Sequence, residues 1–144
     1  MNEMTTTWAG GLRFVHRSAT GHAVVTDAPE AAGGYDSAPT PMELIILSLI
    51  GCTGVDVASI LLKMKQPLES FTVSASHERA EEHPKVYTRI HLVYNLTGDL
   101  DAKRVRRAVN LSENTYCSVS AMLRGTTEIT NEIRINGDDV TVAL

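Results

Sequence analysis

The chain has 144 residues, of which 43% are hydrophobic and 21% are charged, the ordinary balance of a globular protein. Its formal net charge of -4 argues against nucleic acid or an anionic membrane surface as a partner. Two cysteines are too few for a secreted disulfide framework, and no leader-like segment opens the sequence. We therefore expect a cytoplasmic protein with a single domain over residues 1–144.

The first forty residues predict short strands and a loop. Residues 4–16 read as one strand that bends at Gly10-Gly11. A turn at 18–21 leads to a second strand at 22–26, which together predict a hairpin. Residues 27–39 are rich in Ala, Gly and Pro and predict a loop with room for a short strand.

Residues 40–65 predict a long apolar helix around which the chain is organised. Thr40 suits the helix cap and Glu43 the return position of a capping box. The uncharged run 44–55 is too short to span a bilayer, so a buried core helix is expected and no membrane contact. Because apolar residues lie on nearly every face, the helix must be wrapped on all sides, which favours an intertwined homodimer.

The second half predicts two more strands, two helices and a closing strand. Residues 68–77 and 86–97 alternate between polar and apolar types and predict a hairpin. The inward face of its second strand is expected to hold Val86, Thr88, Ile90, Leu92 and Tyr94.

Helices are expected at 100–112 and 115–123, followed by a strand at 126–135 and a tail from Gly137. The resulting order, βββαββααβ, predicts an α+β fold. The first of these helices carries four basic residues that we interpret as a solvated face: Lys103, Arg104, Arg106 and Arg107.

Cys52 and Cys117 are the candidate redox groups. Cys52 lies mid-helix between Gly51 and Gly54, and Cys117 is expected in the first turn of a helix, where the dipole favours a thiolate. A thiolate that attacks a peroxide becomes a sulfenic acid, and a second thiol within reach converts it to a disulfide. The alternative is that both are buried, small apolar residues. Asp56, one turn from Cys52, is expected to make a structural hydrogen bond.

Other kinds of site find little support in the sequence. The histidines lack zinc-ligand spacing with the cysteines, so no metal is expected. Phosphate loops, nucleophile elbows and dinucleotide fingerprints do not occur, so no cofactor is expected.

Two segments resemble one known family over essentially the whole chain. SAPTPMELIILSLIGCTGVDVASIL resembles the central helix of the OsmC/Ohr superfamily, and TYCSVSAMLRGTTEITNEI resembles its second cysteine motif. The chain looks closer to the OsmC-like branch than to the organic-hydroperoxide resistance proteins. The resemblance implies a swapped homodimer in which sheets from both chains enclose two central helices.

The resemblance also implies an activity. Active members reduce organic hydroperoxides to alcohols, with Cys52 as the peroxidatic and Cys117 as the resolving residue here, and a dithiol reductant, lipoylated protein in some members, resets the pair. An Arg of the N-terminal hairpin and a Glu at the helix start activate the thiolate; Arg17 is the best match for the Arg, with Arg13 as a second. Met42 stands where the family has its Glu, and Glu43 occupies the next position. This departure keeps open a non-enzymatic stress protein that binds a small hydrophobic ligand at the dimer interface.

Overall fold

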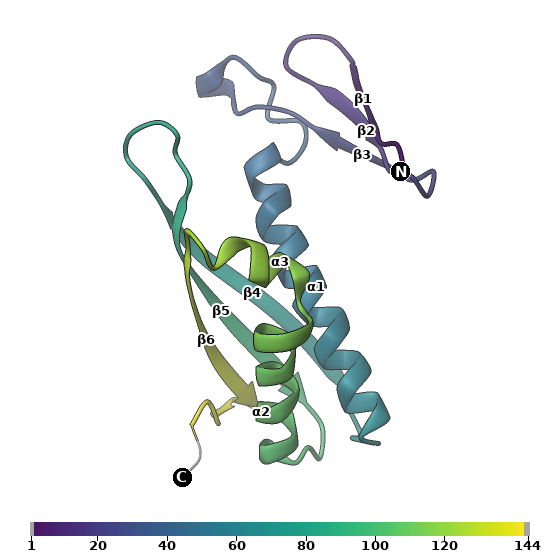
Figure 1. Ribbon diagram of the computed structural model, residues 1–144, viewed down its shortest axis with the longest axis vertical. Helices are drawn as coiled ribbons and strands as arrows, with labels where there is room; N and C mark the ends of the chain where they lie inside the picture. Colours follow the sequence, from purple (N-terminus) through teal and green to yellow (C-terminus); the bar gives the residue numbers. More distant parts are fainter. Residues whose placement is uncertain (1, 143–144) are drawn as a thin grey trace. The chain divides into compact units, whose positions relative to one another are not determined.

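The computed structural model describes residues 2–142, and the chain divides into two compact units, one ending at Leu47 and one starting at Ser48 (Figure 1). The elements are mixed α and β, and the predicted order βββαββααβ is confirmed, with one short strand added at the end. The prediction of a single domain stays a prediction. Each unit is described by itself below.

The first unit holds a three-stranded antiparallel sheet in the order β1-β2-β3, with strands Thr5–Trp8, Phe14–Arg17 and Ala23–Thr26. The predicted single strand over residues 4–16 is wrong, because the chain reverses in its middle. Gly10 and Gly11 adopt φ values of +93° and +59°, which glycine accepts readily, and the Ala9 N–H donates to the Arg13 carbonyl across the turn at 2.9 Å. Within the predicted loop, the space for a short strand holds the 3₁₀-helix η1 (Glu30–Ala32) instead.

Helix α1 runs from Pro41 to Lys63 and begins with the predicted capping box. The Thr40 N–H donates to Glu43 Oε2 at 2.7 Å, and the Glu43 N–H donates to Thr40 Oγ1 at 3.2 Å. These reciprocal bonds satisfy two donors that a helix start otherwise leaves unpaired.

Only one stripe of α1 is buried within the described chain, and its residues are Ile46, Leu49, Thr53, Val57 and Leu61. Another stripe is exposed, with Leu47 at 48%, Val55 at 71% and Leu62 at 64% exposure. By length and composition the helix could cross a membrane, a test that the core helix of a soluble protein also passes. Burial on all sides therefore depends on the homodimer, which stays a prediction.

The second unit is built on a four-stranded sheet in the order β4-β5-β6-β7, with strands Ser70–Arg79, Tyr87–Thr97, Glu128–Ile135 and Asp138–Asp139. Strands β4 and β5 form the predicted hairpin, whereas β5 and β6 are parallel. The parallel pair needs a crossover, which consists of α2 (Ala102–Leu111), the π-helix η2 (Ser112–Tyr116) and α3 (Ser118–Leu123) (Figure 1). The four basic residues of α2 include none that is buried, in keeping with a solvated face.

The inward face of β5 agrees with the prediction only in part. Ile90, Leu92 and Tyr94 are fully buried, but Val86 and Thr88 are exposed and Tyr87 is buried in their place. The pairing of β4 with β5 shifts beside Thr88, since Glu78 pairs with Arg89 and Arg79 with Tyr87. A bulge of this kind adds one residue and so exchanges the two faces of a strand.

The crossover turns two consecutive side chains inward. In η2 both Ser112 and Glu113 are buried, at 0% and 8% exposure, and they continue at helical spacing the buried stripe of Val105, Ala108 and Val109. The second predicted helix, 115–123, begins only at Ser118, and Cys117 is its cap. The crossover therefore delivers Ser112, Glu113 and Cys117 to the interior of the second unit.

Candidate dithiol site

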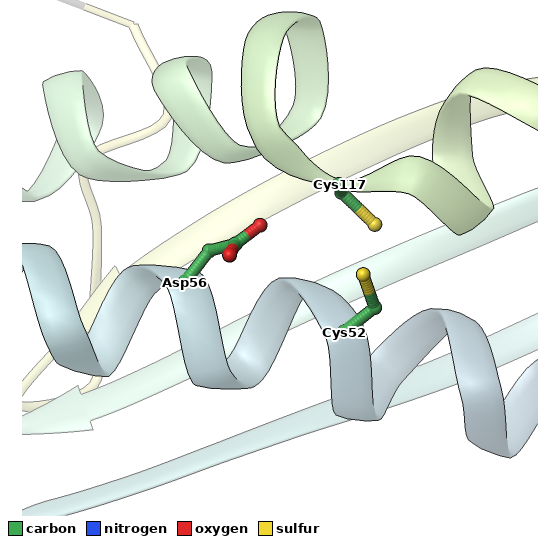
Figure 2. A group of neighbouring side chains, drawn as sticks. All are labelled: Cys52, Asp56 and Cys117. Carbon is green, nitrogen blue, oxygen red and sulfur yellow. The ribbon is translucent and has the colours of Figure 1, made fainter.

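Cys52, Asp56 and Cys117 come together in the second unit. Figure 2 shows the two sulfur atoms pointing toward one another, with the Asp56 carboxyl group beside them. One ligand atom of each side chain lies within 4.8 Å of the other two. Both cysteines are free thiols, Cys52 half-buried and Cys117 buried. The two cysteines that the sequence singled out are thus neighbours in space, as a thiol–disulfide pair requires.

The electrostatic prediction for Cys117 is wrong. Burial raises the pKa of its thiol to about 11, and the neighbouring Cys52 adds to the rise, although the Ser120 N–H donates to Cys117 Sγ at 3.4 Å. The dipole of the short helix α3 stabilises a Cys117 thiolate less than removal of its sulfur from water destabilises it. At neutral pH it is a thiol, not a thiolate.

Asp56 makes the structural hydrogen bond that was predicted. Ser112 Oγ and Asp56 Oδ2 form a hydrogen bond of 2.9 Å, which joins α1 to the start of η2. Ser112 Oγ also lies 2.9 Å from Thr53 Oγ1, and Thr53 Oγ1 lies 2.8 Å from the Tyr94 hydroxyl. The side chains of Ser112, Thr53 and Tyr94 are fully buried, each at 0% exposure.

Glu113 continues this set on the far side of Tyr94. The Tyr94 hydroxyl donates to Glu113 Oε1 at 3.0 Å, Asn131 Nδ2 donates to Oε2 at 2.8 Å, and Arg124 Nη2 lies 3.6 Å from Oε2. Burial and the charge of Glu113 raise the pKa of Tyr94, so its hydroxyl keeps its proton. A buried carboxylate with three partners from three elements is well satisfied.

Sequence reasoning missed Glu113, Arg124 and Asn131, and it treated Tyr94 only as an apolar anchor. One available signal was position: Glu113 stands four residues before Cys117, just ahead of the segment that resembles the second cysteine motif. A second signal was helical spacing, since the buried stripe of Val105, Ala108 and Val109 continues at Ser112 and Glu113.

The three grouped side chains could in principle hold a metal ion. Two thiols and one carboxyl group supply one donor fewer than a closed structural zinc site, and Asp56 already binds Ser112. We therefore interpret the group as a dithiol with a neighbouring carboxyl group.

Two hollows adjoin the site. One of about 550 Å³ is lined by Asp56 and by apolar or aromatic side chains that include Ile60, Met64, Leu111 and Tyr116. A smaller one of about 110 Å³ is lined by Cys117, Glu113 and Arg124 among others. A small molecule with an apolar portion would fit the first better, since it is larger and most of its lining residues are apolar or aromatic, although Lys63 and Asp56 are charged.

The other predicted site residues lie in the first unit. Arg17 ends β2 and is exposed, and Glu43 closes the capping box of α1. The guanidinium carbon of Arg13, the second candidate, lies 5.0 Å from the centre of the Tyr35 ring. Any action of Arg17 or Glu43 on the thiols stays a prediction.

Comparison with known proteins decides the family. The family model described as OsmC-like protein matches residues 34–132, a span that includes both cysteines and the whole crossover. The chain belongs to the OsmC-like family. The predicted membership and fold are thereby confirmed.

Individual OsmC-like relatives agree. The chain is 40% identical to Protein YhfA of Escherichia coli K12 over 129 residues, 89% of this chain and 93% of YhfA. A hypothetical protein from Aquifex aeolicus superimposes with a TM-score of 0.83 at 29% identity, over 94% of this chain and 96% of that one. An organic hydroperoxide resistance protein OsmC from Legionella pneumophila gives 0.69 at 17% identity, over 91% and 96%. The last likeness shows the fold alone.

Proposed function

We propose that this OsmC-like protein is a thiol-dependent peroxidase that reduces organic hydroperoxides to alcohols. The observation that carries the proposal is the pairing of Cys52 and Cys117, whose sulfurs lie within 4.8 Å of each other in the reduced state. The name of the Legionella relative, an organic hydroperoxide resistance protein, points to the same chemistry and a role in peroxide stress.

The two thiols divide the work by exposure. Cys52 is half-buried and attacks the outer oxygen of the hydroperoxide; the O–O bond breaks, the alkoxide takes a proton and leaves as alcohol, and Cys52 becomes a sulfenic acid. Cys117, a buried thiol with a pKa of about 11, suits the later step. Its sulfur displaces hydroxide from Cys52, water leaves, and a disulfide forms. A dithiol reductant such as a lipoylated protein then restores both thiols and is itself oxidised to a disulfide.

Other parts of the proposal concern the surroundings of the site. Arg17 and Glu43 are proposed to assist the Cys52 thiolate. The exposed stripe of α1 supports a homodimer, because Leu47, Val55 and Leu62 lie on one side of the helix and would be covered by a second copy. Val55→Glu is expected to yield monomers in analytical ultracentrifugation, because it places a charge in the proposed interface. An unchanged dimer would mean that the interface lies elsewhere. A cytoplasmic location suits reduced thiols.

The test is a free-thiol count before and after one equivalent of cumene hydroperoxide, with hydrogen peroxide in parallel. We expect both thiols of the wild type to disappear within seconds, faster with the organic peroxide, and to return with dithiol. Cys52→Ser should consume no peroxide, whereas Cys117→Ser should stop at a sulfenic acid that dimedone traps. Equal consumption by Cys52→Ser and wild type would contradict the proposal.

A second candidate is supported by the hollow of about 550 Å³ beside Asp56. Its apolar and aromatic residues, Ile60, Met64, Leu111 and Tyr116, suit a non-enzymatic stress protein that binds a small hydrophobic ligand. Native mass spectrometry of the protein with a medium-chain alcohol or fatty acid separates the two candidates. Bound ligand with slow, unselective thiols favours the second, whereas active thiols without bound ligand exclude it.

A further inference from the structure

A chain of five oxygen atoms runs through the interior of the second unit. In order they are Asp56 Oδ2, Ser112 Oγ, Thr53 Oγ1, the Tyr94 hydroxyl and Glu113 Oε1, with successive separations of 2.9, 2.9, 2.8 and 3.0 Å. The atoms come from α1, η2 and β5, and the three hydroxyl-bearing side chains are fully buried. One end of the chain is beside the two thiols and the other is at Glu113.

Counting hydrogens shows that the hydroxyl groups alone cannot make these contacts. All four separations are hydrogen-bond distances, and a full hydrogen bond needs a hydrogen of its own. Ser112 Oγ, with one hydrogen, would have to donate to both Asp56 and Thr53 if no carboxyl group carried a proton. Ser112, Thr53 and Tyr94 contribute one hydrogen each, and a carboxylate contributes none. With Asp56 and Glu113 both ionised, two bare oxygens would face each other in a buried place, which costs the full desolvation penalty of an unmade bond.

We infer that Asp56 and Glu113 share one proton, which the buried hydroxyl groups of Ser112, Thr53 and Tyr94 pass between them. In one arrangement Asp56 carries it and every hydroxyl donates toward Glu113; in the other Glu113 carries it and every hydroxyl donates toward Asp56. Both arrangements satisfy all contacts. Moving from one to the other transfers a proton across the unit without moving a heavy atom.

The surroundings assign the resting position. Glu113 faces the Arg124 guanidinium and accepts from Asn131 through Oε2, and both contacts favour the carboxylate there. Asp56 faces the two thiols, and Arg124 is turned away from it toward Glu113 and Ser120. The proton therefore rests on Asp56, where the opposite choice would put a negative charge beside two groups that themselves become negative.

This arrangement gives the thiols a proton store, and that use rests on the proposed peroxidase function. As Cys52 gives its proton to the second oxygen of Asp56, the proton already on Oδ2 moves along the hydroxyls to Glu113. Asp56 stays neutral beside the new thiolate. When the thiolate attacks and the O–O bond breaks, Asp56 protonates the departing alkoxide, and the stored proton returns from Glu113. Asp56 then accepts the Cys117 thiol proton and gives it to the hydroxide that leaves as water.

The shared proton is tested apart from activity, by infrared spectroscopy of the full-length protein at pH 7. We expect one protonated carboxyl band in the wild type that shifts in deuterated water. It should vanish in Asp56→Asn and in Glu113→Gln, because each new amide supplies the fourth hydrogen and leaves the other carboxyl ionised. Both variants should fold for the same reason. It should also vanish in Tyr94→Phe, since removing one hydroxyl leaves two contacts and two hydrogens at Asp56.

Asp99→Asn, an exposed aspartate, is the control and should keep the band. No such band in the wild type, or one that survives in both Asp56→Asn and Glu113→Gln, would overturn the inference. Peroxide consumption is measured in parallel, with a loss of about a hundredfold expected for Asp56→Asn and about tenfold for Tyr94→Phe. If the band behaves as expected but the wild type consumes no peroxide, the proposed function fails and the shared proton stands.

Discussion

Asp27 and Glu113 are both buried carboxyl groups, one in each unit, but they are satisfied in opposite ways. Asp27 accepts hydrogen bonds from the backbone N–H groups of Ala28, Tyr35 and Ser37 and from the Ser37 hydroxyl. All of these donors lie within ten residues along the chain. Glu113 is held by Tyr94, Asn131 and Arg124, which come from different elements.

The difference separates a structural carboxylate from one that can take part in proton transfer. The Ser37 hydroxyl, and after it the backbone donors, lower the pKa of Asp27 to about 2, so its charge is fixed over the physiological range. Backbone N–H groups cannot accept a proton in return. The Tyr94 hydroxyl can both donate and accept, and it is itself bonded to another hydroxyl. A buried carboxyl group is therefore best judged by whether its hydroxyl donor is itself bonded to a further hydroxyl, as Tyr94 is to Thr53.

Glu113→Ala should have the largest effect on stability. It leaves Arg124, Asn131 and Tyr94 without their shared partner, and breaking a buried charged network costs about 3 kcal/mol or more. Urea denaturation should show this as a lower midpoint at unchanged slope. Glu128→Ala, which removes only a surface ion pair with Arg89, is the control and should change stability by less than about 1 kcal/mol. Equal losses of stability in the two variants would mean that the Glu113 network stabilises the fold no more than a surface ion pair does.

Thr53→Val should cost less, about 1–2 kcal/mol, because it divides the oxygen chain into two satisfied halves and keeps the side-chain volume. Ser112 then donates to Asp56 and Tyr94 to Glu113, with both carboxyl groups ionised. Thermal unfolding measures the loss, and the exposed Thr115→Val serves as control. A loss as large as that of Glu113→Ala would mean that the halves are not satisfied separately.

Asp27→Asn tests the other carboxyl group through pH. The folded pKa of about 2 lies below the ordinary 3.8, so the stabilisation is fully present above pH 3.8 and is lost as pH falls toward 2. The variant should be less stable than wild type at neutral pH, and the difference should disappear near pH 2. Hydrogen exchange of the Tyr35 and Ser37 amides reports on it locally. A difference that persists at pH 2 would show that shape, not charge, matters there.

Glu43→Ala should have the smallest effect on stability, a few tenths of a kcal/mol up to about 1, because it opens one half of an exposed capping box. Circular dichroism during heating measures it, with Glu69→Ala as an exposed control. Peroxide consumption by the same variant decides its second proposed role. A rate equal to wild type would confine Glu43 to capping.

Local patterns predicted most elements, and long-range contacts account for what they missed. The capping box at Thr40 and Glu43 and the hairpin of β4 and β5 follow from neighbouring residues, so the sequence alone indicates them. The bulge at Thr88 depends on the pairing of two strands, and no period in the sequence marks it. The prediction of one strand over residues 4–16 was wrong because Gly10 and Gly11 permit a chain reversal as readily as a bend.

The candidate site shows the same division. Cys52 and Cys117 could be selected from the sequence because thiols are rare and chemically distinctive. Their meeting in space, and the burial that raises the pKa of Cys117, depend on the crossover between β5 and β6. Helical spacing from Val105 and Val109 places Glu113 on the buried face. What the sequence does not reveal is that Tyr94, Asn131 and Arg124, from distant parts of the chain, satisfy its charge.

The separation of the two cysteines along the chain has a consequence in polymer physics. A bond between Cys52 and Cys117 would close a loop of 117 − 52 = 65 residue steps. Restricting an unfolded chain to that extent removes conformational entropy worth about 4 kcal/mol at room temperature in the loop-closure model. Each catalytic cycle would then alternate the protein between a disulfide form that resists unfolding more and a dithiol form that resists it less. The melting behaviour of the protein in a cell would thus report the fraction of it that is in the disulfide form and has not yet been reduced.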